Sequence, residues 1–311
     1  MINRTALGTA MALSLTVAAP AAAQDLLVFD YSGFEDPSFH GPYVERHGDS
    51  PEFVFFGDED EAFQRLLAGF RADVTHICAG SVPRWRESGL IEPWDRDGIA
   101  AYDSLNADLV GEDVRAGSAD LFFLPTDYGS TAVAYNTDEV PAEDVASLEI
   151  FNDPDYAGRL SIPDNVDDAY ALAYLATGVT DWSDVTDAEF EAATDWLRGI
   201  HDNLLTYWVD PAEIQQLMAS GQVLATWAWN EVPVALADQA FPVGFARNTD
   251  EGTSVWLCGY VKMAEGEGSE ELAYDYVNAL LSEASAGPLL ENGFGSANAA
   301  ALQAQGAEAM E

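Results

Sequence analysis

The chain has 311 residues, of which 54 are acidic and 12 are basic, so its formal net charge at pH 7 is −42. Such a charge is repelled by nucleic-acid backbones and by anionic lipid headgroups, which excludes both classes of partner. A hydrophobic fraction of 48% also excludes disorder, because the chain has enough apolar residues to form one large domain or two lobes.

The first 24 residues have the pattern of a secretory signal peptide. Arg4 supplies a positive charge, an apolar stretch follows at 6–19, and Ala21 and Ala23 form an A-x-A cleavage site. The apolar stretch is shorter than the roughly 20 residues that a membrane-spanning helix needs. We therefore expect a soluble mature protein in the periplasm or outside the cell, where disulfides can form.

Strands and helices alternate in the first part of the mature chain. Short apolar or β-branched runs predict strands, and apolar residues repeated at helical spacing predict helices. In chain order, the pattern predicts a strand at 26–31, a strand at 51–56, a helix at 58–70, a strand at 72–77, a helix at 82–88, a strand ending at 125 and a strand at 131–135. This alternation indicates an α/β lobe with a largely parallel sheet.

The same pattern then starts again. It predicts a strand at 160–162, helices at 169–176 and 187–198, strands at 204–208 and 223–227, a helix at 232–239, a strand at 254–263 and a helix at 271–281. We therefore predict two α/β lobes with a cleft between them. The first lobe is expected at 25–133 with a return segment at about 251–285, and the second at 134–250 with a C-terminal segment at about 286–311.

The motifs of the common catalytic sites are absent from the sequence. It contains no G-x-S-x-G, no H-E-x-x-H and no Walker-type phosphate loop. The four histidines are scattered without metal-ligand spacing, and we expect His76 to be a satisfied core or sheet-end residue. The acidic run at 58–61 lacks the glycine and the final glutamate of a calcium-binding loop. We predict no catalytic residue, no metal and no cofactor.

Two alternatives remain open on the residues alone. Acidic residues are so frequent that a secreted hydrolase with a pair of carboxylates could find them anywhere in the chain. An adhesive or scaffold domain with a flat surface is the other alternative. Cys78 and Cys258 lie far apart in the chain, so either they pair or both are buried thiols.

Aromatic side chains recur where the predicted strands end. In open α/β sheets, ligands bind at the carboxyl ends of the strands, and aromatic rings that meet there suit a cation or a sugar ring. The aromatic residues at these ends are Tyr31, Tyr128, Tyr207, Trp208, Trp227, Trp229 and Trp256.

Several segments in sequence order resemble the periplasmic spermidine/putrescine-binding protein family, the solute receptors of polyamine ABC transporters. They are LLVFDYSGFEDP, ADVTHICAGSVPRWRESGLIEPWD, LPTDYGSTAVAYN, LEIFNDPDYAGRLSIPDN, TWAWNE, EGTSVWLCGYVKMA and NGFGSANAAA. The resemblance implies a two-lobed type II periplasmic binding fold with the ligand cleft between the lobes. It also implies a monomeric receptor that is not an enzyme and that delivers a small organic cation, a polyamine in this family, to a permease in the inner membrane.

The resemblance also implies a set of ligand-binding residues. In this family aromatic rings hold the methylene chain of the polyamine, and carboxylates hold its ammonium ends. The positions of this chain that match are Tyr31, Ser32, Phe34, Tyr128, Asp168, Trp229 and Trp256.

Two carboxylate positions of the family are not acidic here. Asn165 takes the place of the first acid in an acid-x-x-acid pair with Asp168, and Cys258 takes the place of another. A buried ammonium group left without these partners costs several kcal/mol. The acids nearby that could replace them are Asp127, Asp167 and Glu231. A cage richer in aromatics than in acids leaves a quaternary ammonium, such as choline or a betaine, as an alternative ligand.

The resemblance brings the two cysteines together. Cys78 stands where the family has a hydroxyl after the third strand, and both cysteines fall at cleft-lining positions on neighbouring strands of the first lobe. We therefore predict a disulfide between Cys78 and Cys258 at the floor of the cleft.

Overall fold

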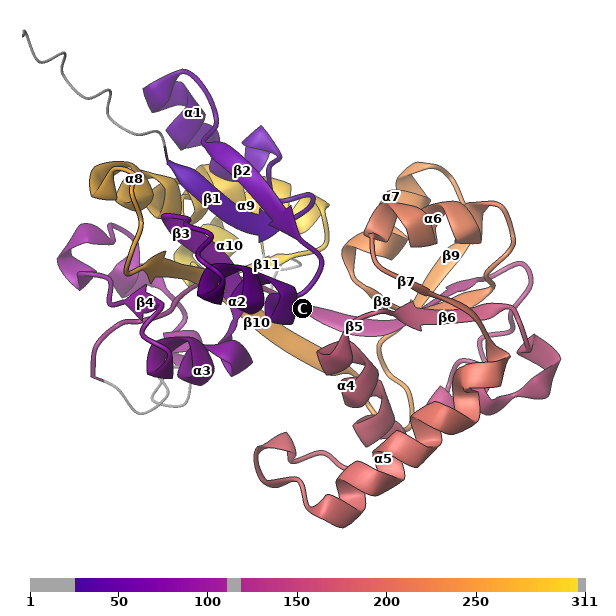
Figure 1. Cartoon of the computed structure of the whole chain (residues 1–311). Helices are drawn as coiled ribbons and strands as arrows, with labels where there is room; N and C mark the ends of the chain where they lie inside the picture. Colours follow the sequence, from indigo (N-terminus) through magenta and orange to yellow (C-terminus); the bar gives the residue numbers. More distant parts are fainter. Residues whose placement is uncertain (1–25, 111–118, 307–311) are drawn as a thin grey trace, which may run out of the picture.

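The computed structural model describes residues 26–110 and 119–306. The predicted signal peptide at 1–24 lies outside the described residues. The chain forms two α/β lobes that are joined by two long strands, β5 and β10 (Figure 1). The strands of both lobes form one continuous sheet with the order β2-β1-β3-β10-β5-β8-β6-β7, to which three further strands pair at the sides.

The first lobe contains the half of this sheet that runs from β2 to β10. Its strands are β1 (Leu27–Tyr31), β2 (Glu52–Phe56), β3 (Val74–Cys78), β10 (Ser254–Met263), the first part of β5 (Leu124–Asn136), and the short β4 (Ile91–Glu92) and β11 (Gly295–Ser296). β1 is parallel to β2 and β3, whereas β10 is antiparallel to both β3 and β5. The carboxyl ends of β1, β2 and β3 therefore lie at one edge.

Two hydrophobic cores cover the two faces of the first lobe's sheet. The helices of this lobe are α1 (Gly41–His47), α2 (Glu59–Leu67), α3 (Val82–Glu87), α8 (Glu270–Leu280), α9 (Glu283–Glu291) and α10 (Ala299–Gln305). One core contains Val28 and Tyr276, and the other contains Phe29 and Trp85. The first of these cores also contains Leu289 and Phe294.

The C-terminal segment therefore packs in the first lobe, whereas we expected residues from about 286 in the second. The physical reason is that α9 follows α8 after a short turn, so its apolar residues reach the core that α8 already covers. β11 then pairs with β5 at Asp127 and Tyr128.

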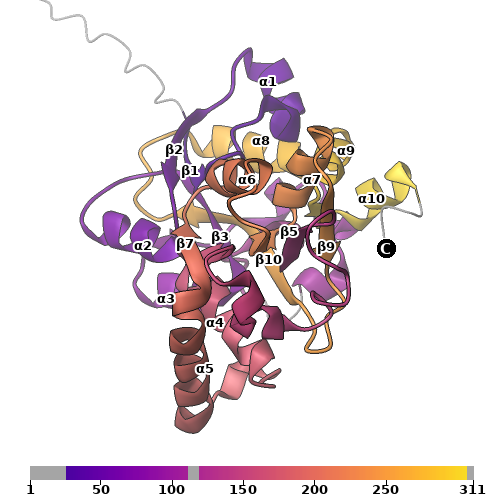
Figure 2. The same ribbon diagram turned by 90° about the vertical axis from the view of Figure 1, so that its right-hand side faces the viewer.

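The second lobe has helices on both faces of its strands. The strands are β6 (Leu160–Pro163), β7 (Leu204–Trp208), β8 (Ala225–Trp229), β9 (Val243–Ala246) and the second part of β5. The helices are α4 (Val166–Ala176), α5 (Asp187–Ile200), α6 (Pro211–Ala219) and α7 (Glu231–Asp238). Figures 1 and 2 show α4 and α5 on one side of these strands and α6 and α7 on the other.

Side chains at the turns before the helices cap the first turns of α4 and α5. Asn165 accepts hydrogen bonds from the backbone N–H groups of Asp167 and Asp168 at the start of α4. Thr186 and Glu189 form a capping box at the start of α5. Such caps satisfy N–H groups that have no partner inside the helix. The cap by Asn165 places the first turn of α4 directly after β6.

β5 belongs to both lobes. Its residues up to Thr131 pair with β10, and its residues from Thr131 onward pair with β8 and then β9. At this crossing Gly129 lies opposite Trp256, and Thr131 lies opposite Trp229. A Cβ at Gly129 would overlap the Trp256 ring, so only glycine lets that ring lie against the strand.

The structure confirms most of the predicted elements to within a few residues. The strand predicted at 223–227 lies two residues later, and the pattern did not predict α1, α6, α9 and α10. Within residues 26–110 and 119–306, no helix has both the length and the hydropathy that crossing a bilayer requires.

Candidate functional site

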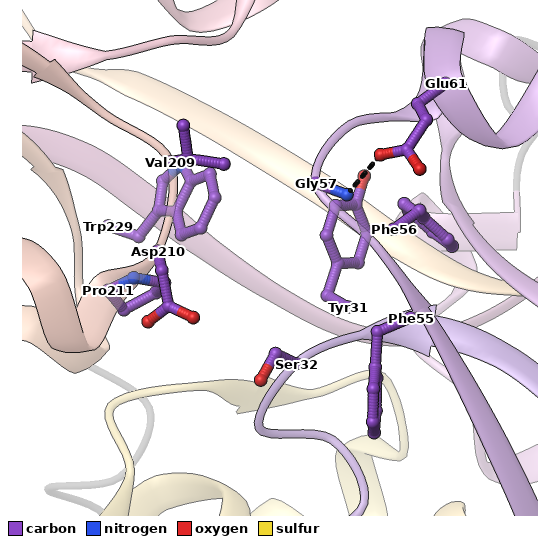
Figure 3. Close-up of a pocket in the computed structure, with 10 residues that line it drawn as sticks. All are labelled: Tyr31, Ser32, Phe55, Phe56, Gly57, Glu61, Val209, Asp210, Pro211 and Trp229. Carbon is purple, nitrogen blue, oxygen red and sulfur yellow. Dashed lines mark hydrogen bonds between the residues drawn. The ribbon is translucent and has the colours of Figure 1, made fainter.

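A cavity of about 350 Å³ lies between the lobes (Figure 3). The first lobe lines it with Tyr31, Ser32, Phe55, Phe56, Gly57 and Glu61, and the second lobe with Val209, Asp210, Pro211 and Trp229. Tyr31, Phe56 and Trp229 are the last residues of β1, β2 and β8. The cavity therefore lies where open α/β sheets bind ligands, at the carboxyl ends of parallel strands.

Aromatic rings from both lobes approach each other at this cavity. The ring centroids of Tyr31 and Trp229 are 6.5 Å apart. Tyr31 also packs edge-on against Phe56 at 4.5 Å, and Trp229 packs edge-on against the buried Trp208 at 4.9 Å. Each ring is held from behind by another ring, so the aromatic wall is fixed by the cores of the two lobes.

Glu59 joins the first-lobe side of this wall to the start of α2. Its Oε1 accepts hydrogen bonds from the Tyr31 hydroxyl at 3.0 Å and from the Cys78 backbone N–H at 2.7 Å. Glu59 is only 7% exposed. Burial raises the pKa of Glu59 above its ordinary value, although hydrogen bonds from the Ser81 side chain, the Cys78 N–H and the Tyr31 hydroxyl lower it.

Asp168 lies in the first turn of α4, where the cap by Asn165 holds the backbone. Its Oδ1 accepts a hydrogen bond from the Thr131 hydroxyl at 2.9 Å, and its Oδ2 accepts one from Trp229 Nε1 at 2.8 Å. Burial raises the pKa of Asp168 to about 6, although both hydrogen bonds lower it. Asp168 thus links β5, α4 and the tryptophan of the aromatic wall.

Glu231 is the first residue of α7, two positions after Trp229. Its Oε2 is buried, and no described residue donates a hydrogen bond to it. Burial, followed by the negative charges of Asp168 and Asp127, raises the pKa of Glu231 to about 7. Asp168 and Asp127 therefore lie close enough for their charges to act on Glu231.

Asp127 belongs to a buried network with a histidine at its centre. His76 Nδ1 bonds to Asp30 Oδ1 at 2.8 Å, and His76 Nε2 bonds to Asp127 Oδ1 at 3.1 Å. The Thr126 hydroxyl also donates to Asp127 Oδ1, at 2.6 Å. Asp127 Oδ2 is buried and has no partner within the described part of the chain.

His76 carries a positive charge in this network. Burial alone lowers the pKa of His76, but the carboxylates of Asp127 and Asp30 outweigh it and raise this pKa to about 10. A charged imidazole donates from both ring nitrogens, as the two contacts require. The Tyr260 hydroxyl donates to the other oxygen of Asp30 at 2.6 Å. The expectation that His76 is a satisfied core residue is confirmed.

The remaining residues that match the family lie at the cavity or behind it. Ser32 is exposed at the edge of the cavity. Phe34 packs edge-on against His76, with ring centroids 4.4 Å apart. Trp256 lies against Gly129. Ser32 therefore lies at the cavity, whereas Phe34 and Trp256 pack behind it, against His76 and Gly129.

Two of the candidate residues have their side chains elsewhere. The Tyr128 ring lies against Gly295, and strand alternation places it on the opposite face of β5 from Asp127. Asp167 is exposed in the first turn of α4. Asn165 is used as the helix cap, so its side-chain carbonyl is already occupied by backbone N–H groups.

The predicted disulfide is present. Cys78 and Cys258 are bonded and lie directly opposite each other on β3 and β10. Asp127 lies opposite Cys258 on the other side, on β5. One half of the disulfide, Cys258, therefore lies beside the strand that holds Asp127, and the other half, Cys78, supplies the N–H group that bonds to Glu59.

Sequence reasoning missed Glu59 and Thr131. Glu59 lies in the acidic run at 58–61, which reads as a solvated surface. It nevertheless lies at helical spacing from Ala62, Phe63 and Leu66, and these four residues are the buried ones of α2. The periodicity of the run could therefore have identified it. Within the described residues, no three His, Cys, Asp or Glu side chains are placed to hold a metal ion.

Comparisons with known proteins agree with this architecture. A family model described as "Bacterial extracellular solute-binding protein" matches residues 53–310. The spermidine/putrescine-binding periplasmic protein of Escherichia coli K12 is 22% identical over 277 residues, which cover 88% of this chain and 77% of that protein.

Solved structures share the fold at low sequence identity. A putative spermidine/putrescine ABC transporter from Listeria monocytogenes superposes with a TM-score of 0.75 and 17% identity, covering 90% of this chain and 85% of the other. The binding protein MotA from A. tumefaciens B6, solved in complex with glucopine, gives a TM-score of 0.74 and 16% identity, covering 90% and 86%. The fold is thus the two-lobed type II periplasmic binding fold, as the resemblance implied.

Proposed function

Since this chain belongs to the bacterial extracellular solute-binding proteins, we propose that it captures a small organic cation for an ABC importer, with a polyamine such as putrescine or spermidine as the first candidate. One observation carries the proposal. Two carboxyl groups, those of Asp127 and Glu231, each have a buried oxygen to which no described residue donates a hydrogen bond. Burying such an oxygen without a donor is unfavourable, and an ammonium group would supply the donor and the opposite charge.

The charges around the cavity support a cation over an anion. The ten residues described as lining it include two acids, Glu61 and Asp210, and no lysine, arginine or histidine. The positive charge of His76 is already shared between Asp30 and Asp127. A ligand carboxylate would therefore meet negative charge without a partner.

The same oxygens favour a primary ammonium over a quaternary one. A quaternary ammonium satisfies an aromatic cage through its charge, but it has no N–H to donate. The unpartnered oxygens of Asp127 and Glu231 need donors as well as positive charge. The rings of Tyr31 and Trp229, which meet edge-on at the cavity, offer an apolar surface to a methylene chain. One relative is named for spermidine and putrescine, and one structural neighbour was solved with glucopine. Because proteins with this fold bind different ligands, the proposal of a polyamine rests on these side chains and not on the fold.

We further propose that the protein works in the periplasm as a monomer and hands its ligand to a permease in the inner membrane. The Escherichia coli relative is periplasmic by name. Binding without turnover is part of the proposal, and it separates a receptor from a carboxylate-pair hydrolase. Mass spectrometry of putrescine or spermidine recovered from the protein should show the unchanged compound.

The ligand proposal predicts an order of affinities. In isothermal titration calorimetry, putrescine or spermidine should bind one to one, at least about tenfold more tightly than choline or 4-aminobutyrate. Choline lacks N–H donors, and 4-aminobutyrate replaces one ammonium with a carboxylate at a similar length. Absence of heat with either polyamine at millimolar concentration would reject the polyamine. Tightest binding of choline would instead support the quaternary ammonium.

Binding should also weaken as the pH falls from 8 to 5. The pKa values of Glu231, about 7, and Asp168, about 6, lie above the ordinary values of carboxyl groups because both groups are buried. A cation favours their charged forms, so its Kd should rise by up to about tenfold per pH unit for each proton that must leave. Aliphatic amines stay charged throughout this range. Calorimetry at several pH values tests this, and a Kd that is constant from pH 8 to 5 would contradict it.

A further inference from the structure

We propose that Gly57 of the first lobe and Val209 of the second form a gate at the cavity, in which the branched side chain of one lobe packs against the glycine of the other and thereby sets the position of the two lobes around a bound ligand. The proposal rests on the proposed function, since a gate serves a receptor that encloses its ligand. It adds two positioning residues that carry no charge, and it makes the size of the side chain at position 57 a determinant of affinity.

The two lobes touch at the gate. Gly57 and Val209 both line the cavity, and a Cβ built on Gly57 would lie 3.4 Å from Val209 Cγ1. That is already van der Waals distance, so a single methyl group at position 57 still fits and the two further methyl groups of a valine do not. Val209 is 54% exposed. Single exposed apolar side chains are common, but this one faces a glycine of the opposite lobe.

The turn that contains Gly57 is tied to the helix that follows it. The Gly57 N–H donates to Glu61 Oε2 at 2.9 Å (Figure 3), and Asp58 accepts a hydrogen bond from the Glu61 N–H at 2.7 Å. Arg65 donates to Glu61 Oε1 at 3.2 Å and to the carbonyl oxygen of Phe55 at 2.8 Å. The end of β2 and the start of α2 are therefore held together, so this turn resists a shift that would make room for a larger side chain.

The turn that contains Val209 has the same construction. The Val209 N–H donates to Glu213 Oε2 at 3.2 Å, and Asp210 accepts a hydrogen bond from the Ala212 N–H at 2.7 Å at the start of α6. The preceding residue, Trp208, is fully buried in the second lobe. Each side of the gate is thus a strand-to-helix turn that a glutamate of the following helix holds. Two held turns with matching shapes meet at one angle between the lobes.

The start of α2 also faces the second lobe at α4. Partial burial raises the pKa of Asp167 in the first turn of α4, and the charges of Asp60 and Asp58 raise it further, whereas Arg84 lowers it. Arg84 is paired with Asp60 at 2.6 Å. Charges act in this way only over short distances. The start of α2 is therefore the part of the first lobe that lies against the second lobe on both sides of the gate.

Exchanging the two side chains of the gate tests the proposal. Calorimetry with putrescine should compare the wild type with Gly57→Val and with the double variant Gly57→Val, Val209→Gly. Gly57→Val should raise the Kd about tenfold or more, because extra methyl groups in a filled contact are unfavourable. The double variant should bind within about threefold of the wild type, because its valine again faces a glycine.

Gly199→Val is the matched control. Gly199 is exposed in α5, and the nearest atom to a Cβ built there is Asn152 Oδ1 at 3.9 Å. This variant should therefore bind putrescine as the wild type does. Circular dichroism and thermal melting show whether each variant is folded.

A pair of cysteines tests the contact without any ligand. In a chain with both Gly57→Cys and Val209→Cys, mild oxidation should join the lobes, because side chains in contact lie within reach of a disulfide. Thiol titration of the denatured, unreduced protein should then find no free thiol, whereas each single variant should keep one. Peptide mapping should show that the bond joins positions 57 and 209 and that the bond between Cys78 and Cys258 is intact.

The outcomes separate the gate from the proposed function. A cysteine pair that does not cross-link would overturn the gate, whatever the ligand is and whether or not Gly57→Val folds. Binding by Gly57→Val that equals that of the wild type would also overturn it, as would weak binding that the exchange of side chains does not restore. If the cross-link forms and the wild type binds no putrescine, the contact between the lobes stands and the polyamine is wrong.

Discussion

Replacing His76 with glutamine should lower the free energy of unfolding by about 3–5 kcal/mol at pH 7. His76 is buried between Asp30 and Asp127, both of which are buried as well. Removing its charge leaves two carboxylates in the core without their shared counter-charge, which costs far more than the loss of a surface ion pair. Urea denaturation followed by circular dichroism measures the change.

His201→Gln is the control for this variant. His201 is exposed and bonds to the Tyr207 hydroxyl, so the same substitution there should change stability by no more than about 0.5 kcal/mol. A His76→Gln variant as stable as the wild type would show that the network carries no net stabilisation.

The same network predicts the direction of the pH dependence. The pKa of His76 is about 10 in the folded protein, because Asp127 and Asp30 outweigh the effect of burial, whereas an exposed histidine has a pKa near 6.5. The folded state therefore holds the proton more tightly than the unfolded state. The stabilisation is complete below about pH 6.5 and is lost as the pH rises toward 10. Denaturation at pH 7 and pH 10 should give a smaller difference between wild type and His76→Gln at pH 10.

Removing the disulfide should have an effect of similar size. The Cys78→Ser, Cys258→Ser double variant loses a bond that closes a loop with a sequence separation of 180, and loss of such a bond costs about 2–5 kcal/mol, chiefly because the unfolded chain is no longer constrained. Ligand binding by the folded variant should persist, because Cys78 holds Glu59 through its backbone N–H and not through its sulfur.

The wild type under reducing conditions is the matched comparison for this variant. Both should unfold at the same urea concentration, below that of the oxidised wild type. Titration of denatured, unreduced wild type should find no free thiol. Two free thiols, or equal stability of the oxidised wild type and the variant, would contradict the role assigned to this bond.

The sequence predicted the elements that contain long apolar runs. The strand predicted at 254–263 coincides with β10, a run rich in apolar, aromatic and β-branched residues. α6 was missed although Asp210 and Pro211 form a cap and a first-turn proline, a signal that short helices give. α9 and α10 are small-residue helices whose place depends on contacts with the first lobe.

The sequence predicted which residues stand at the ends of strands, but it did not predict which way their side chains point. Tyr31 and Trp229 end strands, so their place at the cavity followed from the edge rule. Side chains alternate between the two faces of β5, so Tyr128 and Asp127 point to opposite faces. The Tyr128 ring lies against Gly295. From the sequence, Asn165 was interpreted as the replacement of a ligand-binding acid of the family, whereas in the structure its side chain caps α4. Which oxygen of an acid stays bare depends on tertiary contacts, so the bare oxygens were beyond sequence reasoning.

The crossing of β5 between the lobes has an optical consequence. Trp256 lies opposite Gly129 and Trp229 opposite Thr131, two residues apart on the same strand, while Trp85, Trp208 and Trp227 are fully buried within one lobe or the other. A rotation of one lobe against the other bends this strand and changes the separation and solvent contact of the two indoles at the crossing. The ultraviolet emission of the molecule therefore follows the angle between its lobes without any added label.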